Sequence, residues 1–161
     1  MQGAALAYFD DHTVITDAAG STSEVWFDTE GRTTRTVDAN GAEIAYEYDE
    51  NSNITAITDA LGNSTRYSYD KTGNTLSADY AGEQTETNTY NELGLLTTVT
   101  TAQGDTLFQY DEASRLISVT QPNGDTVNYT YDSHGNRSSM TYPNGKVAFG
   151  LWDRGRFLVP R

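Results

Sequence analysis

An aromatic residue followed by an acidic one recurs along this chain at an almost constant interval. From one pair to the next the spacing is 21, 21, 21, 20, 21 and 21 residues. A fixed period of this length is typical of proteins built from tandem copies of one unit that is too small to bury a core alone. The pairs are Phe27-Asp28, Tyr48-Asp49, Tyr69-Asp70, Tyr90-Asn91 (with asparagine at the acidic position), Tyr110-Asp111, Tyr131-Asp132 and Trp152-Asp153.

Two turn signatures divide each period. The first follows the pair directly, because an Asp with a Gly three residues later is typical of a type I turn. The glycine position is filled by Gly31, Ser52, Gly73, Gly94, Ser114 and Gly135. The second signature comes half a period later, at Asp38–Gly41, Asp59–Gly62, Thr101–Gly104, Gln121–Gly124 and Tyr142–Gly145.

The segments between the turns are short and rich in Thr, Val, Ile and Tyr, as at residues 54–58 and 116–120. Their length is too small for helices and fits strands of about 20 Å. Each period is therefore one β-hairpin, and consecutive hairpins form one antiparallel meander. The sequence predicts an all-β fold of about seven tandem hairpins without helix. Because a lone hairpin is marginal in water, each must be stabilised by its neighbours.

A second aromatic residue precedes several of the pairs by two positions, so both rings of such a strand point to the same face. These residues are Tyr46, Tyr67, Phe108 and Tyr129. We expect rings 21 residues apart to form ladders across the sheet. Apolar residues of the second strand, such as Ile54 and Ile57, are three apart, which strict alternation would put on opposite faces. A β-bulge beside the turn, or a sheet buried on both faces, would explain this spacing.

The composition argues against several classes of function. A net charge of −13 opposes binding to nucleic acid, and no stretch groups Lys or Arg with aromatic residues. The chain has no cysteine and no run of about 20 apolar residues, so we expect no disulfide, no thiolate metal site and no membrane span. Its first residues lack the basic region of a signal peptide.

No catalytic, cofactor or metal motif is visible, and we expect no enzyme activity and no cofactor. The recurrent aspartates are better explained as turn acceptors than as calcium ligands. His12 and His134 are expected in or near turns, without companions for a triad or a zinc site. Exposed rings could instead contact carbohydrate, and Tyr67 and Tyr69 are the candidate residues for that alternative.

The repeat as a whole resembles the YD repeats of Rhs proteins, of toxin-complex C subunits and of teneurins. The pattern is Tyr-x-Tyr-Asp-x-x-Gly followed by Asn or Arg, then a strand and a second Gly turn, and it extends from Trp26 to about Gly145. The signature residues are Tyr46, Tyr48, Asp49, Tyr67, Tyr69, Asp70, Gly73, Tyr90, Gly94, Tyr110, Asp111, Tyr129, Tyr131, Asp132 and Gly135.

The resemblance implies a β-spiral whose wall forms a hollow shell, which in bacterial relatives encloses a C-terminal toxin. It also implies a secreted or surface-exposed bacterial parent protein, whose partners for this segment are neighbouring repeats and the enclosed toxin. No PAAR-like spike, C-terminal plug or toxin tail is found in this chain. A ring of about seven hairpins would be only about 22 Å across, too narrow for a folded domain. We therefore expect a segment of wall, with a carbohydrate- or cell-surface-binding module as the alternative.

The repeat also suggests how the chain is divided. Residues 1–25 are expected to form a degenerate repeat, 26–149 the repeat array and 150–161 a truncated or degenerate repeat. Residues 158–161 match the remnant of a thrombin site, so a tag, a frameshifted end and a natural end all stay open. An open meander leaves two edge strands, for which we expect edge-to-edge self-association.

Overall fold

A computed structural model of the chain describes residues 5–82, 84–149, 151–153 and 156–158. The chain divides into two compact units, Met1–Thr85 and Glu86–Arg161. Within the described ranges every regular element is a β-strand, which confirms the all-β prediction. These ranges accordingly contain no helix able to cross a membrane.

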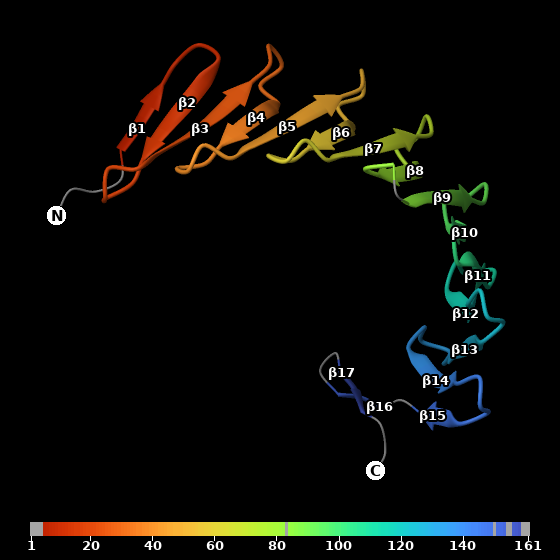
Figure 1. The fold of residues 1–161 in the computed structure, drawn as a ribbon. Coiled ribbons are helices and arrows are strands. Elements are labelled where there is room, and N and C mark those ends of the chain that lie inside the picture. The colour runs from red at the N-terminus through yellow and green to blue at the C-terminus, as the bar shows by residue number, and fades with distance from the viewer. Residues whose placement is uncertain (1–4, 83, 150, 154–155, 159–161) are drawn as a thin grey trace. The chain divides into compact units, whose positions relative to one another are not determined.

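The first unit is an antiparallel meander in which each strand pairs with the next along the chain. Its strands lie side by side in sequence order (Figure 1). They are β1 (Ala5–Tyr8), β2 (His12–Thr16), β3 (Thr22–Phe27), β4 (Thr33–Val37), β5 (Glu43–Tyr48), β6 (Ile54–Thr58), β7 (Ser64–Tyr69) and β8 (Thr75–Tyr80).

The second unit repeats this arrangement and begins within β9. Strands β9 to β15 pair consecutively and antiparallel, while β16 and β17 form a separate two-stranded sheet. The predicted meander of tandem hairpins is therefore confirmed in both units. The strands are β9 (Gln84–Tyr90), β10 (Leu96–Thr101), β11 (Gly104–Tyr110), β12 (Leu116–Thr120), β13 (Thr126–Tyr131), β14 (Arg137–Thr141), β15 (Val147–Phe149), β16 (Leu151–Asp153) and β17 (Arg156–Leu158).

The turns after the aromatic pairs from Phe27-Asp28 to Tyr131-Asp132 have the predicted hydrogen bonds. The backbone N–H of Gly73 donates to the carbonyl of Asp70 at 3.1 Å, and the N–H of Asp70 donates to the carbonyl of Asn74 at 2.9 Å. Gly73 has a φ of 86°, in the left-handed region where glycine has no steric penalty. Ser52 and Ser114 adopt the same conformation, with φ of 66° and 61°, and their Cβ atoms make it strained.

A β-bulge directly follows this turn and accounts for the three-residue spacing of apolar side chains. Glu47 pairs with Ala56, whereas the next residue, Tyr48, pairs with Ile54. Thr55 is thus the extra residue, and Ile54 returns to the face that carries Ile57. Of the two explanations of that spacing, the bulge is confirmed.

The second turn between β10 and β11 is shorter than the one at Asp38. Thr101 pairs directly with Gly104, so only Ala102 and Gln103 form the loop between β10 and β11. At Asp38 the loop is one residue longer, because the Asp38 N–H donates to the carbonyl of Ala42. This deletion explains why the interval in this part of the sequence is 20 residues instead of 21.

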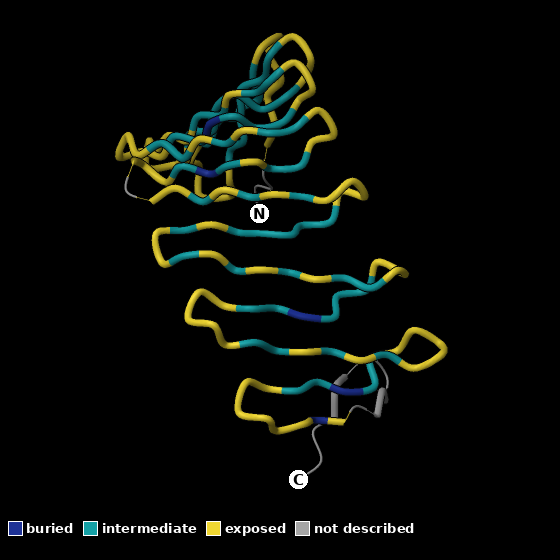
Figure 2. The backbone as a smooth tube through the Cα atoms, turned by 90° about the vertical axis from the view of Figure 1, so that its right-hand side faces the viewer, coloured by how far each residue is buried: buried dark blue, intermediate teal, exposed yellow. Residues whose placement is uncertain are grey.

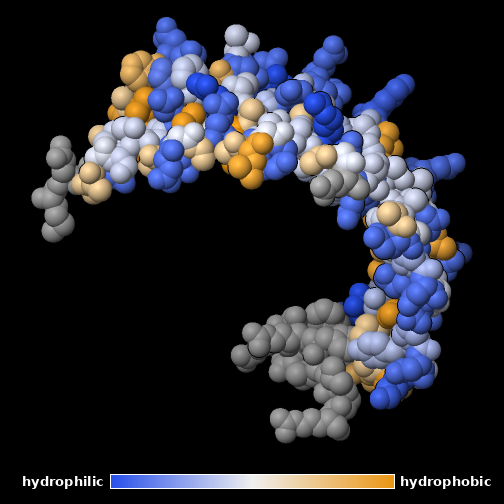
Figure 3. Space-filling view, in the orientation of Figure 1, coloured by the Kyte–Doolittle hydropathy of each residue, from blue (hydrophilic) through white to orange (hydrophobic). Residues whose placement is uncertain are grey.

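Each unit is a single layer of sheet. The described residues include no large side chain that is fully buried, and the most enclosed are small: Ala56 is 2% and Ala78 3% exposed. Buried segments are short and isolated along the tube (Figure 2). On the face drawn in Figure 3 apolar residues form small patches among hydrophilic ones. Stability must therefore come from contacts within the layer.

The division into residues 1–25, 26–149 and 150–161 stays a prediction. In the structure β1 and β2 form a hairpin inside the first range, and β16 and β17 form one inside the last. Except for Leu158, the possible tag remnant at 158–161 lies outside the described residues.

Candidate functional site

The recurrent aspartates hold the turns in a repeated arrangement, which we call the Asp clasp. In the β11–β12 turn one oxygen of Asp111, Oδ1, accepts the backbone N–H groups of Ala113 and Arg115 at 3.0 and 2.9 Å. The other oxygen, Oδ2, accepts Nε of Arg115 at 2.7 Å, and Nη2 is also 2.7 Å away. The carboxylate thus fixes the turn through both oxygens, as an Asx-type acceptor does.

The same clasp closes four other turns of this kind. The side chain four residues after the aspartate, either Arg or Asn, donates to Oδ2 at 2.7 to 3.1 Å in every case. The pairs are Asp28 with Arg32, Asp49 with Asn53, Asp70 with Asn74 and Asp132 with Asn136.

Hydrogen bonds to the ionised form lower the pKa of each clasp aspartate. The strongest case is Asp70, whose pKa is far below its usual value because the Thr72 hydroxyl and the Asn74 amide both donate to it. For Asp111 the main cause is the Arg115 side chain. These carboxylates are therefore ionised near neutral pH.

A tyrosine strap joins four of the described hairpins to the preceding one. The hydroxyl of Tyr48 on β5 donates to the carbonyl of Thr33 on β4 at 2.6 Å. This carbonyl lies beyond Arg35 and Ala45, the last β4–β5 ladder pair on that side, so the strap bonds a group that the ladder leaves out. The same bond joins Tyr69 to Ile54, Tyr110 to Leu96 and Tyr131 to Leu116, at 2.7 to 2.9 Å.

Guanidinium groups cover several of the rings. The Arg32 guanidinium carbon lies 4.7 Å from the centre of the Tyr48 ring, and its Nη1 donates to the carbonyl of Asp49 at 3.2 Å and to the Ser52 hydroxyl at 3.1 Å. Arg32 therefore belongs to the clasp of its own turn and also contacts the next turn. Arg115 over Tyr131 and Arg137 over Tyr129 make similar cation–π contacts.

The expected ladder of rings is mixed rather than purely aromatic. Tyr48 pairs with Ile54, and the Tyr69 hydroxyl bonds to the same Ile54 from the other side. A residue of the bulged strand thus stands between successive rings, because rings 21 residues apart belong to every second strand. Leu116 stands between Tyr110 and Tyr131 in the same way.

The two candidate carbohydrate residues lie on this ladder, on what we call the tyrosine face. Tyr67 pairs with the buried Ala78, and Tyr69 is strapped to Ile54. Burial raises the pKa of the Tyr69 hydroxyl, with smaller contributions from Tyr67 and Asp49. The hydroxyl of Tyr69 is therefore engaged within the sheet.

Tyr90 and Gly94 also occupy their repeat positions. Tyr90 ends β9 and pairs with Leu96. Gly94 has a φ of 74°, and its N–H donates to the carbonyl of Asn91 at 2.9 Å. Gly135 makes the equivalent bond to Asp132 at 3.0 Å.

Periodicity missed an aromatic stack on the opposite face of the first unit. His12 lies in β2, between the rings of Phe9 and Trp26, at centroid distances of 4.4 and 4.2 Å. Arg35 covers the far side of Trp26, and Asp11 bonds to Nδ1 of His12 at 2.7 Å. The histidine is therefore part of a packed stack. In the sequence, the short interval between Phe9 and His12 was the only indication of this stack.

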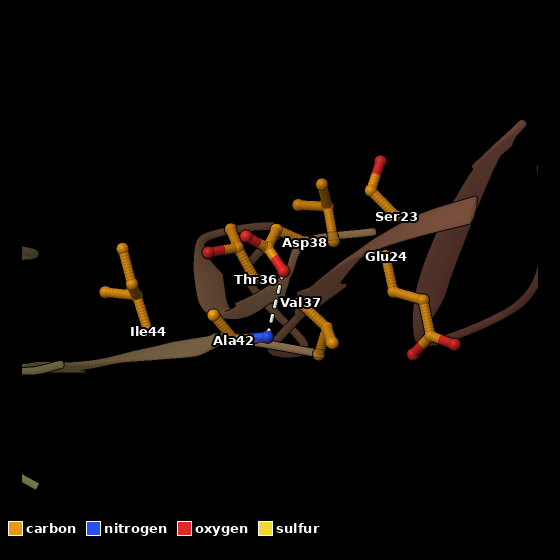
Figure 4. Close-up of a pocket in the computed structure, with 8 residues that line it drawn as sticks. Ser23, Glu24, Thr36, Val37, Asp38, Ala42 and Ile44 are labelled. Carbon is orange, nitrogen blue, oxygen red and sulfur yellow. Dashed lines mark hydrogen bonds between the residues drawn. The ribbon is translucent and has the colours of Figure 1, made fainter. Parts of the chain in front are cut away.

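A shallow hollow of about 260 Å³ opens on the tyrosine face between β3, β4 and β5. Figure 4 shows Thr36 and Ile44 on one side of the strands and Val37 on the other. Val25 and Thr36 occupy the repeat positions of Tyr46 and Ile57, so the hollow marks a missing ring.

In the described ranges no three His, Asp or Glu side chains are grouped so that they could hold a metal ion. The clasps each connect a hairpin to itself, and the straps connect it to its neighbour.

A family model described as RHS Repeat matches the sequence at residues 27–63, 48–85, 90–126 and 110–147. The overlapping matches cover well over half of the chain. No curated protein sequence matches it.

Several solved structures of Tc toxin proteins share the fold. The Photorhabdus luminescens Tc holotoxin pore with a TccC3 variant matches with a TM-score of 0.67, 17% identity and coverage of 84% of this chain and 9% of the other. The crystal structures of TcdB2-TccC3-Cdc42 and of TcdB2-TccC3 without its hypervariable C-terminal region match with TM-scores of 0.56 and 0.55, both at 20% identity, covering 85% of this chain and 8% of the other. The chain thus spans less than a tenth of these proteins, and identities this low establish likeness of fold alone.

Proposed function

The chain belongs to the RHS repeat family, and on that premise we propose that it is a wall segment of a shell that encloses a C-terminal toxin in the parent protein. The role is structural and non-catalytic. The parent is a bacterial protein that is secreted or displayed at the cell surface, and the partners of this segment are the flanking repeats and the enclosed toxin.

One observation supports the proposal: the side chains that recur from repeat to repeat join hairpins within a single layer. The Asp111–Arg115 clasp holds a turn, and the strap from Tyr131 to Leu116 holds the following strand. A globular domain would bury one face of such a sheet against a second layer. A layer that is held together within its own plane suits a wall with contents on one side and solvent on the other.

The proposal is tested on the parent protein, expressed from the complete reading frame that contains residues 1–161. A protease is added to the native protein and to a separately expressed C-terminal tail. We expect the tail to resist cleavage in the parent and to be cut rapidly alone. Equal rates of cleavage of the two tails would contradict enclosure.

Carbohydrate binding on the tyrosine face stays the alternative. Glycan-array binding by the purified chain that disappears on Tyr67→Ala and Tyr69→Ala would favour it. The strap at Tyr69 argues against it, since a sugar would have to compete with the bond to Ile54. A variant that unfolds would be recognised by loss of the β-sheet circular dichroism spectrum.

A further inference from the structure

The hairpin of β9 and β10 lacks the clasp that its neighbours have. Asn91 stands where the other turns carry aspartate, and its Oδ1 still accepts the N–H groups of Leu93 and Leu95, each at 3.0 Å. Leu95 occupies the Arg or Asn position, and its side chain has no donor. The charge-assisted bond through Oδ2 is therefore impossible in this turn.

The same hairpin carries a polar residue within the ladder. Asn88 pairs with Val99 on the tyrosine face, at the position filled by Tyr67 and Tyr129 in other repeats. Its Oδ1 is buried and, among the described residues, meets no donor, while its Nδ2 makes only a 3.3 Å bond to Glu86. A buried acceptor without a donor costs stability, and the ring that would cover the strand is missing.

The loop that ends the hairpin also has a weaker side-chain acceptor than the loop at Asp59. Thr101 Oγ1 accepts the N–H of Gln103 at 3.3 Å. In the corresponding place Asp59 accepts the N–H groups of Leu61 and Asn63 at 2.9 and 2.8 Å. Two independent features, in the turn and in the ladder, thus weaken this hairpin, and its loop is held less firmly than the one at Asp59.

We propose that the β9–β10 hairpin is the opening point of the repeat array, where hydrogen bonds break before those of the other hairpins. Proteins open locally in cooperative units, and in a repeat array each unit depends on its own stability and on its immediate neighbours. The unit with the weakest internal contacts therefore opens most often. This inference concerns the chain itself and holds whether or not the parent forms a shell.

Hydrogen–deuterium exchange of the full chain, followed by mass spectrometry, tests the proposal. Loss of one charge-assisted hydrogen bond is expected to speed exchange of the paired amides in β10 about tenfold or more over their equivalents in β6 and β12. Equal protection of the three hairpins would overturn the proposal.

Two matched variants make the test specific. The double variant Asn91→Asp with Leu95→Asn restores the clasp and is expected to slow exchange in β9–β10 toward that of its neighbours. The reverse double variant, Asp111→Asn with Arg115→Leu, is expected to move fast exchange to β11–β12. If the restored clasp leaves the β9–β10 rates unchanged, the turn does not control opening and the proposal is wrong. Asn88→Tyr, which restores the missing ring of the ladder, is expected to slow exchange in β9–β10 independently of the turn.

Discussion

The hydroxyl of Tyr69 donates a 2.7 Å hydrogen bond to the carbonyl oxygen of Ile54, fifteen residues earlier in the chain. The backbone ladder between β6 and β7 covers only Ala56 to Thr58 of β6. The Tyr69 bond joins the two strands beyond the end of this ladder. We expect Tyr69→Phe to lower the free energy of unfolding by about 0.5 to 1.5 kcal/mol, the net value of one such bond. Urea denaturation measures it.

Tyr67→Phe is the matched control for that experiment. Tyr67 lies two residues away on the same face, and no hydrogen bond of its hydroxyl is found among the described residues. Its replacement is expected to change stability little. Equal losses of unfolding free energy in the two variants would mean that the strap hydrogen bond adds no stability to that provided by the ring.

Substitutions at two left-handed turn positions are expected to change stability in opposite directions. Gly73→Val forces a β-branched residue to a φ of 86° and is expected to cost about 1 to 3 kcal/mol. Ser114→Gly relieves the same strain and is expected to stabilise by a few tenths to about 1 kcal/mol. Thermal melting distinguishes them, with a mid-strand Thr→Ala variant as the reference. Equal effects of Gly73→Val and the reference would show Gly73 to be an ordinary turn residue.

The clasp aspartates predict how stability depends on pH. Their pKa values are lowered in the folded chain, as for Asp49, Asp70 and Asp111. Groups of this kind add stability above their unfolded pKa of about 3.9 and lose it as the pH falls through their lower folded values. The clasps should therefore stay intact at pH 5 and weaken below about pH 4. Denaturation between pH 2 and 7 measures this. Asp111→Asn should flatten the acid limb, and an unchanged limb would contradict the assignment.

The edge strand β1 predicts self-association. In the described part of the chain β1 pairs only with β2, and its Leu6 and Tyr8 are 56% and 75% exposed. Its outer N–H and C=O groups can pair with another strand. The net charge of −13 opposes this, and salt screens the repulsion within about 8 Å at physiological strength. Sedimentation from 20 to 500 mM salt should show association that grows with salt, whereas a monomer throughout would mean that the edges are protected.

The sequence predicted the features that repeat with a fixed interval. Turn residues such as Asp70 and Gly73 act locally, so their spacing alone located the hairpins and their order. The bulge at Thr55 was one of two options, because apolar spacing does not say how an extra residue is absorbed. The expectation of a β-spiral shell came from the resemblance to YD repeats and not from the spacing.

Contacts between hairpins were beyond the sequence pattern. The strap from Tyr69 to Ile54 and the stack of Phe9, His12 and Trp26 depend on the register between strands. Periodicity placed the tyrosines on one face correctly but could not show that the intervening strand separates their rings.

We infer that the stability of this chain is built hairpin by hairpin within one layer. Three truncated chains that end at residues 149, 128 and 107 differ by one repeat period each. The free energy of unfolding of each chain, measured in urea, tests this inference. We predict a stepwise fall of similar size per hairpin, because each step removes one clasped turn and the strap that joins it to the preceding hairpin. A complete loss of folding on going from residue 149 to residue 128 would indicate one global core, and no change would indicate independent hairpins. Either result would contradict stability built hairpin by hairpin.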